Sequence, residues 1–265
     1  MFWILARSKF LKLDGLSNSW MSLVLILKVV GGYCVGRYYL TTYQGGDIHG
    51  FLSDANQFFV LFLKSPMDFF KLIGGVEVES ELVQEFYTHL TSWFSSGYSI
   101  YYNDTRSVIR FHALIRLFSN GNEWIHLLWS NVLCVAGMVA LIQFISFKNK
   151  ESLIFNRWAL LILFLPNVFI CSSAILKEPL LIFAMGMTLK YFQQWNYNRN
   201  LSNALCLMFF ILCFFLVKSF WLLAFLPGLL IWFLLPNMKN AMITLSLSYG
   251  ISLLLVLVVG EFFCH

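Results

Sequence analysis

The chain has 265 residues, of which 59% are hydrophobic, 18% are aromatic and only 12% are charged. A soluble globular protein of this length needs more polar residues to cover its surface, so the composition excludes a soluble protein. It predicts a protein that lies in the lipid bilayer. The net charge of +5 does not indicate nucleic-acid binding, because no basic stripe on a soluble domain is present to contact phosphates.

Apolar windows close to the length of a membrane-spanning helix recur along the chain. A helix that rises 1.5 Å per residue needs roughly 20 apolar residues to cross a hydrocarbon core. The windows lack the alternation of a barrel strand, so we predict an all-α, polytopic transmembrane helix bundle that forms one integral membrane domain, residues 1–265. The spans, about seven, cover residues 20–40, 124–147, 157–176, 179–194, 201–217, 219–235 and 241–260. A re-entrant turn at residues 172–179 is an alternative for the third and fourth.

The basic residues indicate the orientation of the spans. With the N-terminus in the cytoplasm, most Lys and Arg of the short loops lie inside, against only Lys177 and Lys218 in outer turns. We therefore expect a multi-pass protein of a plasma or inner membrane with a cytoplasmic N-terminus. Lys28 and Arg37, within the first span, are expected to snorkel toward opposite faces of the membrane.

This orientation places one long loop, residues 41–123, outside the cell. The loop is rich in aromatic residues and poor in proline, so we expect it to fold. One predicted helix has Ser65 as its cap, Pro66 at its first position and Asp68 reaching back as in a capping box. A second amphipathic helix covers residues 105–118.

Several charged residues of this loop are candidates for binding or catalysis. Asp47 and Asp54 directly follow the first span, where acids can act on a membrane-bound substrate. Arg106 and Arg110 lie one helical turn apart, and paired guanidiniums suit a lipid phosphate. The alternative is that both arginines only snorkel or pair with nearby carboxylates.

A second candidate motif is the short turn that contains Lys177 and Glu178. At the bilayer centre each charge would cost about 2.5–3.5 kcal/mol, so the two should lie at the outer interface or line a polar cavity. In a functional interpretation Lys177 contacts an anionic substrate group and Glu178 orients it. In the alternative they form an ion pair in a plain turn before the helix that begins at Pro179.

The sequence contains no motif for a structural metal site, because the histidines are scattered without a ligand spacing. A divalent cation held by Asp47 with substrate phosphates is chemically conceivable, but no motif indicates one. The cofactor is therefore left open.

The layout resembles the GT-C type of polytopic membrane glycosyltransferases. The shared features are an internal N-terminus, one anchor span, Asp47 shortly after it, a large outer loop with amphipathic helices, and closely spaced helices behind it. Residues 103–126 are also similar to that family's return from loop to membrane, and residues 165–178 to its turn between the third and fourth spans. The resemblance covers residues 20–195, and the chain has fewer spans than such enzymes usually have.

The resemblance implies transfer of a sugar from a polyprenyl-phosphate-linked donor at the outer face of the membrane, as in the biosynthesis of cell-envelope polysaccharide. Asp47 would take the proton from the acceptor hydroxyl, and Asp54 would assist it or cap a helix. Arg106, Arg110 or Lys177 would hold the leaving phosphate. The implied partners are the lipid-linked sugar donor, membrane lipids and, for a short family member, a second membrane subunit.

A function of a different class also fits the layout: a non-catalytic membrane protein, either a flippase-like transporter or a component of envelope polysaccharide assembly or polymerisation. Transporters typically carry charges near the membrane midplane and show paired halves. Here only Lys28 lies well inside a span and no repeat is visible, which favours the enzyme.

Overall fold

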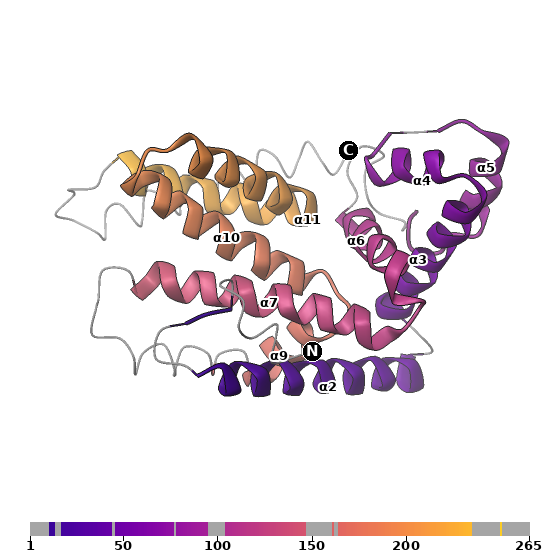
Figure 1. The fold of residues 1–265 in the computed structure, drawn as a ribbon, viewed down its shortest axis with the longest axis horizontal. Coiled ribbons are helices and arrows are strands. Elements are labelled where there is room, and N and C mark those ends of the chain that lie inside the picture. The colour runs from indigo at the N-terminus through magenta and orange to yellow at the C-terminus, as the bar shows by residue number, and fades with distance from the viewer. Residues whose placement is uncertain are drawn as a thin grey trace.

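The computed structural model describes residues 11–13, 17–43, 46–76, 78–94, 104–146, 161, 164–234 and 250, and every regular element within these ranges is helical. The elements are α2 (Asn18–Tyr43), α3 (Gly46–Lys64), α4 (Pro66–Ile73), α5 (Glu81–Thr88), α6 (Asp104–Ser119), α7 (Glu123–Ser146), α9 (Pro166–Ser173), α10 (Glu178–Tyr197) and α11 (Leu201–Leu234). Figure 1 shows the long helices α2, α7, α10 and α11 in one part of the molecule and α3 to α6 gathered at one end of it.

Several helices are suited to a membrane. Within the described residues, three helices are long and apolar enough to cross it: Asn18–Tyr43, Glu123–Ile145 and Leu201–Leu226. The consecutive helices α9 and α10 also qualify as a pair, but they are bent by 100° at a short break, so they form either one broken span or a re-entrant loop. The prediction of an all-helical fold is therefore confirmed, and the described residues contain three helices, or four with the bent pair, that could span a membrane.

The individual spans agree with the sequence to different degrees. Helices α2 and α7 match the predicted spans 20–40 and 124–147, and α10 matches 179–194. The predicted boundary at residue 218 falls on a break in α11, where Lys218 has non-helical angles, φ −156° and ψ 92°. Of the predicted span 157–176, only α9 and the bend after it are described at length, and the span 241–260 lies outside the described residues except for Gly250.

Close backbone contact joins α7 to α10. A Cβ atom built on Gly137 would lie 2.4 Å from the Ile182 carbonyl oxygen, and one built on Gly186 would lie 2.0 Å from the Gly137 carbonyl oxygen. Small residues let helices in a membrane approach closely and gain van der Waals contact. These two glycines therefore determine how close α7 and α10 can lie.

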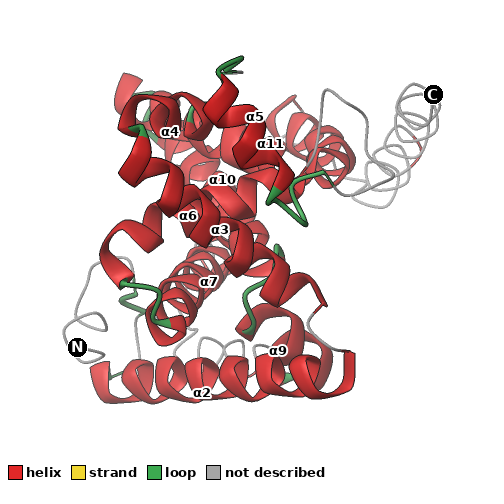
Figure 2. Ribbon diagram, turned by 90° about the vertical axis from the view of Figure 1, so that its right-hand side faces the viewer, coloured by secondary structure: helices red, strands yellow, loops and turns green. Residues whose placement is uncertain are grey.

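The described parts of the 41–123 loop fold into four helices that share one hydrophobic core. Phe58 of α3, Phe69 of α4, Phe86 of α5 and Val108 of α6 are all buried in this core. Leu180 of α10 and Phe214 of α11 belong to the same core, which fastens the loop helices to the long helices. Figure 2 shows the same grouping from the side, with α3, α4 and α6 above α2.

Two predicted loop helices are confirmed, and one detail is corrected. The helix predicted at residues 105–118 is α6, and the helix predicted after Ser65 is α4. However, Ser65 makes no side-chain hydrogen bond to the helix backbone, so the predicted capping box is wrong. Its hydroxyl donates instead to the Asp68 carboxylate over 2.8 Å, and its backbone N–H already donates to the Leu61 carbonyl oxygen over 2.7 Å, so Asp68 has no N–H of Ser65 to accept from.

Candidate functional site

Four charged side chains form two ion pairs where the loop helices meet the bend between α9 and α10. Lys177 Nζ lies 2.6 Å from Asp104 Oδ1, and Lys218 Nζ lies 3.6 Å from Glu178 Oε1. The side chains of the first pair are only 14% and 7% exposed, whereas those of the second are 28% and 34% exposed. Because Lys177 and Glu178 are consecutive, the two pairs adjoin, and we call these four residues the ion-pair site.

The local structure explains why these residues meet. Glu178 and Pro179 begin α10, where proline suits the first turn and a carboxylate interacts favourably with the helix dipole. Lys218 lies at the break in α11, where its backbone leaves helical geometry. The Ser107 hydroxyl of α6 donates to the Leu216 carbonyl oxygen over 2.7 Å and so joins α6 to this break.

Asp47 lies at the beginning of α3, one residue before a side chain that shares a buried cluster with the bend between α9 and α10. It occupies the first turn of α3 and is exposed, and in the described part of the chain its carboxylate has no hydrogen-bond or ion-pair partner. Its neighbour Ile48 packs in one buried cluster with Ala174 and Ile175 of the bend that leads to Lys177. A free carboxylate in this position is able to accept a proton.

Asp54 has a different environment. It is fully buried, and its Oδ1 atom accepts hydrogen bonds from the backbone N–H and the hydroxyl of Thr91, over 2.9 and 3.1 Å. Its Oδ2 atom accepts from the backbone N–H groups of Ser92 and Trp93, over 2.9 and 2.8 Å. These four bonds occupy both oxygens, so the geometry favours a structural role in holding residues 91–93 over the predicted role in proton transfer.

The two arginines of α6 lie against the segment that Asp54 holds. The guanidinium carbons of Arg106 and Arg110 lie 5.1 and 5.2 Å from the centroid of the Trp93 ring. Arg106 Nε donates to the Trp93 carbonyl oxygen over 3.4 Å, and Arg110 Nε donates to the Leu72 carbonyl oxygen over 3.0 Å. Burial, and then the charge of Arg106, lower the pKa of Arg110. Neither arginine forms an ion pair with a carboxylate within the described residues, so both keep charge that an anion can neutralise.

A buried histidine pair connects α6 to α7. His112 Nδ1 lies 3.1 Å from His126 Nδ1, and His126 Nε2 lies 3.0 Å from the Ser119 hydroxyl. Burial, and then the neighbouring His126, lower the pKa of His112 well below its usual value. The described residues contain no group of three or more side chains that could hold a metal ion. The pair therefore serves as a polar contact between the two helices.

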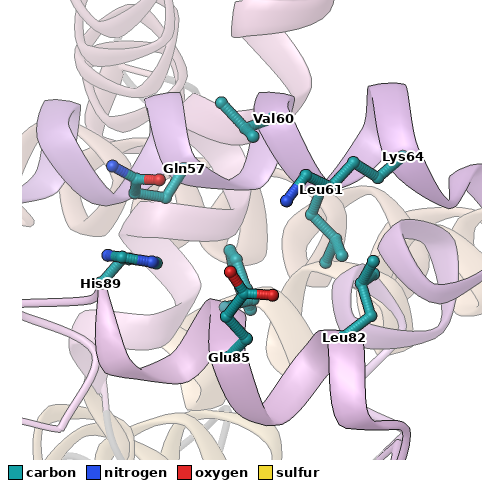
Figure 3. A pocket seen from close by; sticks show the side chains of 8 residues that line it. Gln57, Val60, Leu61, Lys64, Leu82, Glu85 and His89 are labelled. Carbon is teal, nitrogen blue, oxygen red and sulfur yellow. The ribbon is translucent and has the colours of Figure 1, made fainter.

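A small pocket lies elsewhere, between α3 and α5, as Figure 3 shows. Its volume of about 30 Å³ leaves room for roughly one water molecule. It is lined by Gln57, Val60, Leu61, Lys64, Leu82, Glu85, Phe86 and His89. None of these is a candidate site residue, so this pocket plays no part in the function proposed below.

The structure thus brings Lys177 and Glu178 together with two residues that the sequence did not single out, Asp104 and Lys218. A signal for each was present, because Asp104 directly precedes the predicted amphipathic helix 105–118 and Lys218 interrupts a long apolar run. Comparison of the chain with models of protein families, with curated proteins and with solved structures gave no match. The function is therefore argued from the site alone.

Proposed function

We propose that this chain is a membrane glycosyltransferase-like protein that transfers a sugar from a polyprenyl-phosphate-linked donor at the outer face of the membrane. The observation that carries the proposal is the free carboxylate of Asp47 in the first turn of α3, whose next residue, Ile48, shares a buried cluster with the bend that leads to Lys177. A potential base and potential phosphate-binding cations thus lie on two segments that one buried cluster joins, and we propose that both face a lipid headgroup.

In the proposed reaction, the Asp47 carboxylate takes the proton of an acceptor hydroxyl. The hydroxyl oxygen forms a bond to the anomeric carbon while the bond from that carbon to the phosphate oxygen breaks, and the configuration inverts. The electron pair of the broken bond leaves on polyprenyl phosphate. Fixed positive charge stabilises this developing anion best when it is already in place before the reaction.

In this proposal Lys177 and Lys218 are the cations that hold the leaving phosphate. In the absence of substrate their carboxylate partners Asp104 and Glu178 hold them in position. Arg106 and Arg110, held by Trp93, are a second pair of cations that suit a phosphate. We assign Asp54 to the support of the Trp93 segment, because its oxygens already accept four hydrogen bonds.

The proposal includes the membrane topology that the sequence predicts. The excess of Lys and Arg in the predicted inner loops supports a cytoplasmic N-terminus, with residues 41–123 outside and about seven spans in a single domain. Helices α3 to α6, which lie at one end of the long helices, would then cover the outer side of the bundle.

A transporter is the second candidate, and one observation favours it. The helices α9 and α10 are broken by a 100° bend, and Lys28 is fully buried beside the end of α9. Broken helices and buried charges are typical of substrate sites in transporters.

Reconstitution of the protein in liposomes with a polyprenyl-phosphate-linked sugar distinguishes the two candidates. The enzyme transfers the sugar to an acceptor and releases polyprenyl phosphate. Movement of intact donor between the leaflets, without release of polyprenyl phosphate, would support the transporter and reject the enzyme.

A further inference from the structure

Lys28 is a buried cation in the middle of α2. It is 0% exposed, and its Nζ atom donates to the hydroxyl oxygens of Ser172 and Ser173, over 2.8 and 3.0 Å. The expectation that Lys28 snorkels to a membrane face is therefore wrong, because these two hydroxyls satisfy its ammonium group inside the bundle. Within the described residues no carboxylate pairs with it.

The partners of Lys28 lie at the C-terminal end of the short helix α9. The last four carbonyl groups of a helix lack partners within the helix, and an unpaired polar group is costly in an apolar bundle. Asn131 Nδ2 of α7 donates to the Ser173 carbonyl oxygen over 2.9 Å. A cation also interacts favourably with the negative end of a helix dipole. Asn131 therefore supplies a partner for one carbonyl of the broken end of α9, and Lys28 bonds the two serine hydroxyls there and places a cation at the negative end of the helix dipole.

Two glycines of α2 bring its backbone against α9. A Cβ atom built on Gly32 would lie 2.1 Å from the Ser173 carbonyl oxygen, and one built on Gly31 would lie 2.2 Å from the Phe169 ring. Lys28 lies four residues before Gly32, about one helical turn away on the same face. The Lys28 side chain therefore has to extend only about one helical turn along α2 to reach the serines at the end of α9.

The bend that follows Ser173 leads directly to the ion-pair site. Ala174 and Ile175 are fully buried against α2, α3 and α7, and Lys177 follows two residues later. The position of Ser173 therefore limits where Lys177 and Glu178 can lie. A change at the end of α9 would alter their reach toward Asp104 and Lys218.

We propose that Lys28 is a positioning residue whose ammonium group pins the end of α9 to α2 and thereby fixes the bend that presents Lys177 and Glu178. The use of the fixed bend rests on the proposed function, but the contact of Lys28 with the end of α9, which we call the pin, does not depend on it. This positioning role also explains why a cation is buried in the membrane bundle, with no need for a transported substrate.

The accessibility of a thiol in the bend tests the proposal. Ile175→Cys is introduced into a chain whose six native cysteines are replaced, and its rate of labelling by a charged maleimide is measured in detergent. The buried thiol should react slowly in this parent. Lys28→Met, which keeps the length of the side chain but removes its charge, should raise the rate at least tenfold. Arg37→Met, on the exposed side of the same helix, is the matched control and should leave the rate unchanged.

A second reporter separates local opening from unfolding. Ala113→Cys lies in the core of the loop helices and is also 0% exposed, and its labelling should not respond to Lys28→Met. The variant with Ser172→Ala and Ser173→Ala should raise labelling at position 175, and adding Lys28→Met should raise it no further, because all three changes break one contact. An unchanged rate at position 175, an equal rise at position 113 or additive effects would each overturn the proposal.

The labelling experiment needs no sugar transfer. If Lys28→Met opens the bend but the parent transfers no sugar, the pin stands and the proposed enzymatic function fails. If the parent transfers sugar and Lys28→Met leaves the bend closed, the enzymatic function stands and the pin fails.

Discussion

Asp104 and Lys177 are 73 residues apart in the chain, and their side chains meet at 2.6 Å in a largely buried ion pair. Asp104 begins α6 of the 41–123 loop, and Lys177 ends the bend before α10. The pair therefore joins the loop helices to the membrane helices at the candidate site. Removal of one partner of a buried ion pair is strongly destabilising in general.

A double-mutant cycle with Asp104→Asn and Lys177→Met should show strong coupling. We expect an interaction free energy above about 1 kcal/mol, within the range of about 0.5–3 kcal/mol typical of contacting residues. The measurement is thermal or denaturant unfolding in detergent. The control cycle uses Asp68 and Lys71, whose atoms are 3.9 Å apart and whose lysine side chain is 47% exposed, and its coupling should stay near zero. Equal coupling in the two cycles would contradict the structural importance of the buried pair.

Asp54→Asn should destabilise the protein much more than Asp47→Asn does. An amide nitrogen at position 54 would face backbone N–H groups that now donate to a carboxylate oxygen. Each lost hydrogen bond to a charged group costs about 1.5–3 kcal/mol. Asp47 is exposed and has no partner in the described part of the chain, so its amide should leave the unfolding temperature unchanged. Similar unfolding temperatures for the two variants would refute the structural role of Asp54.

Gly32→Ala should weaken the contact between α2 and α9. The added methyl group would lie 2.1 Å from the Ser173 carbonyl oxygen, and such overpacking costs about 1–3 kcal/mol. Gly228→Ala is the matched control, because a Cβ atom there meets nothing described within 4 Å and alanine favours a helix. Unfolding temperatures should fall for the first variant and stay level or rise for the second. A harmless Gly32→Ala would show that α2 and α9 lie farther apart.

Stability should fall at acidic pH because of His112. Burial and the neighbouring His126 lower the pKa of His112 in the folded state, so the unfolded state takes up a proton first. The contribution of the neutral imidazole is therefore fully present above the unfolded pKa of about 6.5 and is lost as pH falls toward the lowered folded value. Between pH 7.5 and 5 the parent should lose more stability than His112→Gln, whereas the exposed control His89→Gln should follow the parent. Parallel curves for the parent and His112→Gln would rule out this origin.

The sequence predicted the helices better than the contacts between them. Apolar windows and the proline at position 66 were sufficient for α2, α4, α7 and α10, because length and local propensity determine these elements. The partners of Lys28, Asp54 and Arg106 depend on how distant segments pack. The spacing of residues along the chain does not predict these contacts. From the sequence alone, an exposed carboxylate after a span, such as Asp47, cannot be distinguished from one whose oxygens accept hydrogen bonds from a distant loop, such as Asp54.

Sugar transfer by Asp47→Asn is the most direct test of the proposed function. Membranes that carry the parent, Asp47→Asn or Asp68→Asn are supplied with a radiolabelled polyprenyl-phosphate-linked sugar, and incorporation into acceptor is measured. The amide keeps the shape of the side chain but cannot accept the proton, and a general base contributes about 10²–10⁴-fold. We expect a loss of at least that order for Asp47→Asn at unchanged membrane insertion, and little loss for Asp68→Asn, whose carboxylate accepts a bond from Ser65 in α4's first turn. Transfer by Asp47→Asn at the parental rate would contradict the assignment of Asp47 as the base.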